Sequence, residues 1–122
     1  MTTVLLVDDN EVNRYLAQYL MEQAGIEVVT ATNGHEALRM ARARRPQLIL
    51  MDIQMPVLDG YTATEQIKAD PQLSGIPVVA LTTFAGVADR ERALGAGCVA
   101  HIAKPLDPDS FLDQVRAYAV PA

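Results

Sequence analysis

Short apolar runs alternate with segments of helical spacing along the whole of this chain. The apolar runs cover residues 3–7, 28–31, 48–51, 78–81 and 99–103, and each has the length of one buried strand. Apolar side chains recur three or four residues apart at Val12, Tyr15, Leu16, Tyr19 and Leu20, and again at Phe111, Leu112 and Val115. This spacing predicts an apolar face on a helix in each of the two segments. Five successive pairs of strand and helix indicate a parallel sheet with helices on both faces.

Local signals mark the helix ends and support this order. Helix starts are indicated by Asn33 with Glu36 three residues later and by Asp107 before Pro108, and helix exits by Gly25 and Gly97. The apolar runs are nearly continuous, as expected of strands that are buried on both faces. Since crossovers between parallel strands are right-handed, we expect a flavodoxin-like (βα)5 three-layer sandwich with strand order 2-1-3-4-5.

Length and composition exclude several classes of protein. A chain of 122 residues, half of them hydrophobic, has the size of one domain, which we expect to cover residues 1–122. The net charge of −5 gives no broad basic face for nucleic acid. The single cysteine, Cys98, excludes an intrachain disulfide and is expected to be a small buried hydrophobe. Neither a signal peptide nor an apolar run of about 18 residues is present, so we expect a cytoplasmic protein without membrane contact.

Carboxylates directly follow two of the apolar runs. Asp8 and Asp9 come after the first run and Asp52 after the third. Taken alone, an acidic pair before a helix is more often a cap. In the predicted sheet, however, these strands are neighbours at the point where the strand order reverses, and ligands bind at such carboxyl ends. Three converging acids repel one another and need a positive charge. This charge could come from Mg²⁺, which prefers oxygen ligands, from Lys104 after the fifth run, or from both together.

These residues together resemble the receiver domains of bacterial two-component response regulators, over essentially the whole chain. The residues that carry the resemblance are the pair Asp8-Asp9, Asp52 with the sequence MPVLDG at 55–60, Thr82 after the fourth strand, and Lys104-Pro105 after the fifth. Each motif alone is weak. Five markers in this order, at the ends of four different strands, are hard to obtain by chance.

The resemblance implies a phosphoacceptor site. Asp52 would take a phosphoryl group from the phosphohistidine of a sensor histidine kinase or phosphotransfer protein, giving an acyl phosphate. Mg²⁺, or Mn²⁺, would be held by Asp9, Asp52 and the main-chain carbonyl of Gln54, while Asp8 would hold a metal-bound water. Phosphoryl transfer mostly requires positioning and neutralisation of charge, so the absence of an obvious general base is no obstacle.

The resemblance also implies a switch. Thr82 would donate its hydroxyl to the phosphoryl group, and Lys104, preceding a cis peptide bond to Pro105, would pair with Asp52 before transfer and with the phosphoryl group afterwards. His101 occupies a position of the fifth strand where the family usually has Tyr or Phe, and its ring would turn inward on phosphorylation. This change would alter a surface formed by the fourth helix, fifth strand and fifth helix, to which a downstream protein would bind.

Two other functions remain open. The first is a small Mg²⁺-dependent phosphohydrolase acting through an aspartyl-phosphate, although dehalogenase-like hydrolases have an Asp two residues after the nucleophile, where this chain has Gln54. The second is a degenerate receiver acting only as a binding module, which would have lost some of the markers. We therefore expect a signalling domain rather than an enzyme. No output domain is expected after the fifth helix.

Overall fold

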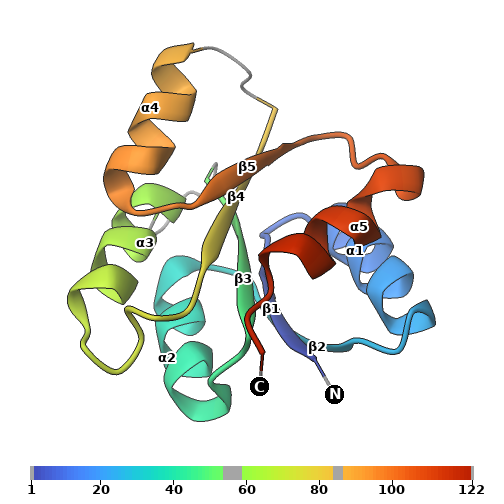
Figure 1. Cartoon of the computed structure of the whole chain (residues 1–122), viewed down its shortest axis with the longest axis horizontal. Coiled ribbons are helices and arrows are strands. Elements are labelled where there is room, and N and C mark those ends of the chain that lie inside the picture. Colours follow the sequence, from blue (N-terminus) through green and yellow to red (C-terminus); the bar gives the residue numbers. More distant parts are fainter. Residues whose placement is uncertain (1, 54–58, 84–86, 122) are drawn as a thin grey trace.

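The computed structural model of the chain describes residues 2–53, 59–83 and 87–121 (Figure 1). Strands and helices alternate in these ranges as β1 (Thr3–Val7), α1 (Glu11–Gln23), β2 (Glu27–Ala31), α2 (Gly34–Arg44), β3 (Leu48–Asp52), α3 (Gly60–Ala69), β4 (Val78–Thr82), α4 (Val87–Ala96), β5 (Ala100–Ala103) and α5 (Pro108–Tyr118). The strands form one parallel sheet in the order β2-β1-β3-β4-β5. Both the elements and the strand order predicted from the sequence are confirmed.

The sheet has an apolar core on each face. Figure 1 shows α1 and α5 on one side of the sheet and α2, α3 and α4 on the other. In β1, Val4 and Leu6 belong to the core under α1 and α5, while Leu5 and Val7 belong to the opposite core. Successive side chains of a strand point to opposite faces. The strands β3 and β4, which are covered on both faces, therefore bury every side chain, whereas the edge strands β2 and β5 are only partly buried.

Helix α1 packs on the sheet differently from the prediction. The predicted apolar face is largely exposed, with accessible fractions of 76% for Val12, 70% for Tyr15, 41% for Leu16 and 50% for Tyr19. The rings of Tyr15 and Tyr19 stack on each other, with centroids 6.5 Å apart. Ala17 and Met21 are the buried side chains of α1, and Leu20 packs against the same core as a half-buried residue. Spacing thus identified an apolar stripe, but the side of α1 that carries Ala17 and Met21 faces the sheet.

The predicted helix ends are confirmed. The side chain of Asn33 accepts the amide of Glu36 at 2.9 Å, Asp107 caps α5 with Pro108 in its first turn, and Gly25 and Gly97 leave α1 and α4 with φ of +82° and +112°. Glycine has no Cβ penalty in this left-handed region. These four signals therefore fix where the helices begin and end.

Cys98 is buried, as expected for a small hydrophobe. Its Sγ lies 3.9 Å from Oγ1 of Thr64 in the core under α2, α3 and α4. Burial raises the pKa of the thiol above its ordinary value, so it stays protonated at neutral pH. Among the described residues, no helix combines the length and the apolar character that crossing a bilayer requires.

Candidate functional site

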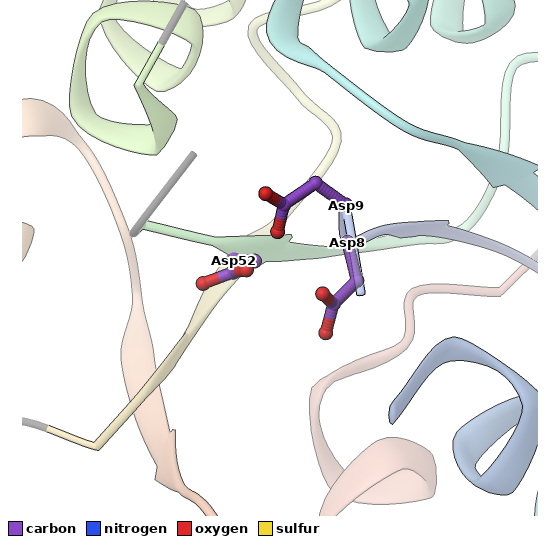
Figure 2. A group of neighbouring side chains, drawn as sticks. All are labelled: Asp8, Asp9 and Asp52. Atoms are coloured by element: carbon purple, nitrogen blue, oxygen red, sulfur yellow. The ribbon is translucent and has the colours of Figure 1, made fainter. Parts of the chain in front are cut away.

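Three carboxylates meet where β1 and β3 end (Figure 2). Asp8 and Asp9 follow β1, and Asp52 is the last residue of β3. These strands are hydrogen-bonded neighbours, with Val7 opposite Met51 in the register. One oxygen from each carboxylate lies within 4.8 Å of the oxygens from the other two. The convergence predicted from the strand order is confirmed.

The three acids differ in burial. Asp8 and Asp52 are 1% and 2% exposed, whereas Asp9 is on the surface. A buried carboxylate is stable only when it is hydrogen-bonded and paired with a positive charge. The site therefore needs a cation close to Asp8 and Asp52, while Asp9 is exposed to solvent.

Lys104 supplies a positive charge to both buried acids. Its Nζ lies 3.1 Å from Oδ2 of Asp8 and 3.4 Å from Oδ2 of Asp52, and its side chain is only 11% exposed. The main-chain amide of Lys104 donates to the carbonyl of Thr82 at 2.8 Å, and its peptide bond to Pro105 is cis. Lys104 thus pairs with Asp52 as expected, but it shares its charge with Asp8, to which it lies closer.

Asp8 is also tied to the start of α1. Its Oδ1 accepts the amide of Asn10 at 2.9 Å, and its main-chain carbonyl accepts a hydrogen bond from Nη1 of Arg14 at 2.9 Å. The N-cap of α1 is Asn10, whose side chain accepts the amide of Asn13. The acidic pair therefore does not serve as the helix cap. Nothing in the sequence distinguished Arg14 from an ordinary surface residue of a helix.

Thr82 and His101 lie on the neighbouring strands. Thr82 ends β4 and is buried, one residue beyond Leu81, which is opposite Asp52 in the register. His101 is a half-buried residue of β5 and lies opposite Ala80. The fold therefore places Thr82 at the same sheet edge as the acids. The switch role of both side chains stays a prediction.

The start of α3 is packed against the backbone of Asp52. Asp59 caps this helix by accepting the amide of Thr62 at 2.8 Å. A Cβ atom on Gly60 would lie 2.4 Å from the carbonyl oxygen of Asp52 and 2.6 Å from Cα of Ile53. Such distances are far inside van der Waals contact. Only glycine fits here, and the close approach fixes the first turn of α3 beside the site.

The donor atoms of the site fit a hard divalent cation. Mg²⁺ prefers oxygen ligands, binds few protein carboxylates and retains several waters. Asp8, Asp9 and Asp52 provide carboxylate oxygens around one point, and one of these acids is open to solvent. The carbonyl of Gln54, predicted as a further ligand, lies outside the described residues. The described part of the site is thus consistent with the predicted metal.

Comparisons with known proteins place the chain in a family. Residues 4–116 match the model of the response regulator receiver domain. The polar-differentiation response regulator DivK of Brucella anthropi is 44% identical over 116 residues, which cover 95% of this chain and 94% of DivK. DivK of Brucella ovis is 42% identical with the same coverage.

Solved structures give the same result. The chemotaxis protein CheY4 of Vibrio cholerae superposes with a TM-score of 0.92 at 30% identity, covering 97% of this chain and 98% of CheY4. The receiver domain of the sensor histidine kinase PA1611 of Pseudomonas aeruginosa gives a TM-score of 0.88 at 36% identity, covering 96% of each chain, and has a magnesium ion coordinated in its active-site cleft. The protein therefore belongs to the response regulator receiver domain family of two-component signalling.

Proposed function

We propose that Asp52 is the phosphoacceptor of this receiver domain and that its donor is the phosphohistidine of a sensor histidine kinase or phosphotransfer protein. The observation that carries the proposal is the ion pair from Lys104 to both Asp52 and Asp8, beside the exposed Asp9. Asp52 is the acid at the end of the central strand of the sheet. It thus lies close both to a cation, Lys104, and to a carboxylate suited to metal binding, Asp9.

The metal that we propose is Mg²⁺ or Mn²⁺, held by Asp9, Asp52 and the carbonyl of Gln54, with Asp8 accepting a hydrogen bond from a metal-bound water. The support is the group of carboxylates around one point and the magnesium ion in the related PA1611 receiver. A bound divalent ion supplies positive charge to the phosphoryl oxygens during transfer.

The remaining chemistry is assigned to the residues of the chain. A carboxylate oxygen of Asp52 forms a bond to phosphorus, while the bond from phosphorus to the donor imidazole breaks and its electron pair stays on the nitrogen. An ionised carboxylate has no proton to lose, so no general base is needed. Lys104 moves from the carboxylate to the phosphoryl oxygens, and the hydroxyl of Thr82 donates to one of them.

Phosphorylation is proposed to alter the surface formed by α4, β5 and α5, to which a downstream protein binds. Thr82 ends β4, and the next strand, β5, carries His101 two register positions before the partner of Thr82. Movement of Thr82 toward the phosphoryl group would therefore change the packing around the half-buried ring of His101. We propose that this is a cytoplasmic signalling domain and not an enzyme with a turnover substrate.

The phosphoacceptor is tested by intact-mass spectrometry after incubation with acetyl phosphate and Mg²⁺. We expect the parent protein to gain one adduct of about 80 Da and Asp52→Asn to gain none, because an acyl phosphate requires the carboxylate. Asp113→Asn, which changes an exposed acid on α5, is the control and should behave as the parent. A persistent adduct on Asp52→Asn would refute the assignment.

The same incubation separates the three functions. A stoichiometric adduct that decays slowly is the expected result for a receiver. Continuous release of many equivalents of phosphate would instead identify a phosphohydrolase. Failure of the parent to form any adduct would identify a binding module.

A further inference from the structure

Arg14 contacts the acidic site from the first turns of α1. Its main-chain amide donates to the carbonyl of the N-cap Asn10 at 3.0 Å, which anchors it in the helix. Its Nη1 reaches back and donates to the main-chain carbonyl of Asp8 at 2.9 Å. A guanidinium stays protonated at any accessible pH, and hydrogen bonds from charged donors are stronger than neutral ones. The donor in this contact therefore keeps its charge under physiological conditions.

The contact of Arg14 completes the fixation of Asp8. The main-chain amide of Asp8 donates to the carbonyl of Ala31 at 3.1 Å, and its two carboxylate oxygens accept from the amide of Asn10 and from Lys104. The carbonyl that Arg14 binds belongs to the planar peptide unit joining Asp8 to Asp9. A hydrogen bond that fixes the carbonyl oxygen of Asp8 therefore also fixes the orientation of this plane, which includes the Cα atom that carries the Asp9 side chain.

Asp9 is the acid that most needs such support. Lys104 bridges the two buried acids, Asp8 and Asp52, whereas Asp9 is exposed and lies beyond the end of β1. The other two carboxylates repel it, and rotation of the peptide unit would let it turn toward water. A fixed carbonyl on that unit opposes this rotation.

We propose that Arg14 is a positioning residue for the acidic site. Its guanidinium fixes the peptide unit between Asp8 and Asp9. It thereby keeps the Asp9 carboxylate close enough to the Asp52 carboxylate for both to bind the same cation. The inference rests on the proposed function, because it is the metal that gives the position of Asp9 its importance. Outer residues that orient metal ligands typically change metal affinity by one to two orders of magnitude when replaced.

A purely structural role for Arg14 makes a different prediction. An arginine that only fastens α1 to the sheet would change the stability of the fold by the same amount with and without metal. A positioning residue changes the affinity for the metal itself. The two roles are therefore distinguished by the difference between metal-bound and metal-free protein.

The first measurement is the Mg²⁺ dissociation constant, followed by amide resonances during a titration at fixed ionic strength. We expect Arg14→Met, which keeps an apolar stem but no donor, to weaken binding by about tenfold. Arg14→Lys retains a charged donor and should recover part of the loss. Arg44→Met is the control. Arg44 pairs with Glu27, which begins β2 and so lies at the amino-terminal ends of the strands, away from the acids, and its replacement makes the same change in net charge.

The second measurement needs no metal. The amide of Asn10 donates to the Asp8 carboxylate. In EDTA, we expect this amide to exchange its hydrogen several times faster in Arg14→Met than in the parent. The Met21 amide of α1 is the internal control, and its exchange rate should change less. Unchanged Mg²⁺ affinity together with unchanged Asn10 exchange would overturn the proposal. If the parent binds no Mg²⁺, the proposed metal site fails, and Asn10 exchange alone decides whether Arg14 holds this peptide unit.

Discussion

Gly60 shows how one residue without a side chain can fix the geometry of the site. It is the first residue of α3, and its backbone approaches the carbonyl of Asp52 and Cα of Ile53 so closely that a Cβ has no room. Its neighbour Asp59 caps the helix. The start of α3 is therefore built directly on the peptide unit that carries the proposed phosphoacceptor.

Replacing Gly60 by alanine should destabilise the fold by about 1–3 kcal/mol, as overpacking does when the obstacle is backbone. The matched control is Gly95→Ala in α4, where an added Cβ has no heavy atom within 4 Å. This control should raise stability by about 0.4–1 kcal/mol, because alanine reduces the freedom of the unfolded chain. Urea denaturation measures both. Equal effects of the two substitutions would contradict the close approach at Gly60.

At the scale of elements, α3 and α4 are joined by a cation–π contact. The guanidinium carbon of Arg92 lies 4.2 Å from the ring centroid of Tyr61, which is buried at 6% exposure. The Tyr61 hydroxyl donates to the carbonyl of Asp89 at 3.5 Å. Burial raises the pKa of Tyr61, although the charge of Arg92 opposes the rise. The ring therefore stays neutral at physiological pH, as the contact requires.

A double-mutant cycle measures this link between the two helices. Tyr61→Leu and Arg92→Met should show a coupling free energy of about 0.5–2 kcal/mol in urea denaturation, the range for partly desolvated cation–π pairs. The control is a second cycle that combines Tyr61→Leu with Arg90→Met, because Arg90 is an exposed arginine on the same helix. Coupling of Tyr61 to Arg90 as strong as that to Arg92 would show that the charge of α4, and not the contact, is responsible.

At the scale of the whole molecule, metal binding and folding should be linked. Converging carboxylates destabilise the folded state through repulsion, and a cation bound only by the folded state offsets this. At free Mg²⁺ of about 100 times its dissociation constant, linkage gives roughly 2.7 kcal/mol of added stability. Asp9→Ala should lose most of this gain. The test is thermal unfolding in Mg²⁺ and in EDTA at matched ionic strength, and equal midpoints for the parent would argue against the metal site.

Much of the architecture was predictable because its physical signals are local or regular. Strands covered on both faces exclude polar residues, so the runs ending at Val7 and Met51 were visible without tertiary information. The caps at Asn33 and Asp107 depend on hydrogen bonds within a few residues. Right-handed crossovers then restricted the possible topologies, and in the flavodoxin-like order the first and third strands lie side by side. The acids that follow these strands were consequently expected at one edge of the sheet.

The sequence by itself therefore determined the order of elements, the strand order and the meeting of Asp8, Asp9 and Asp52. Only the tertiary structure decided how α1 sits on the sheet, because an apolar stripe such as that of Tyr15 and Tyr19 does not specify which side of a helix makes contact. The same holds for Arg14, whose link to the Asp8 carbonyl depends on the angle at which α1 leaves β1. Local chemistry fixes helices and strands, whereas contacts between them depend on packing geometry that no short stretch of sequence encodes.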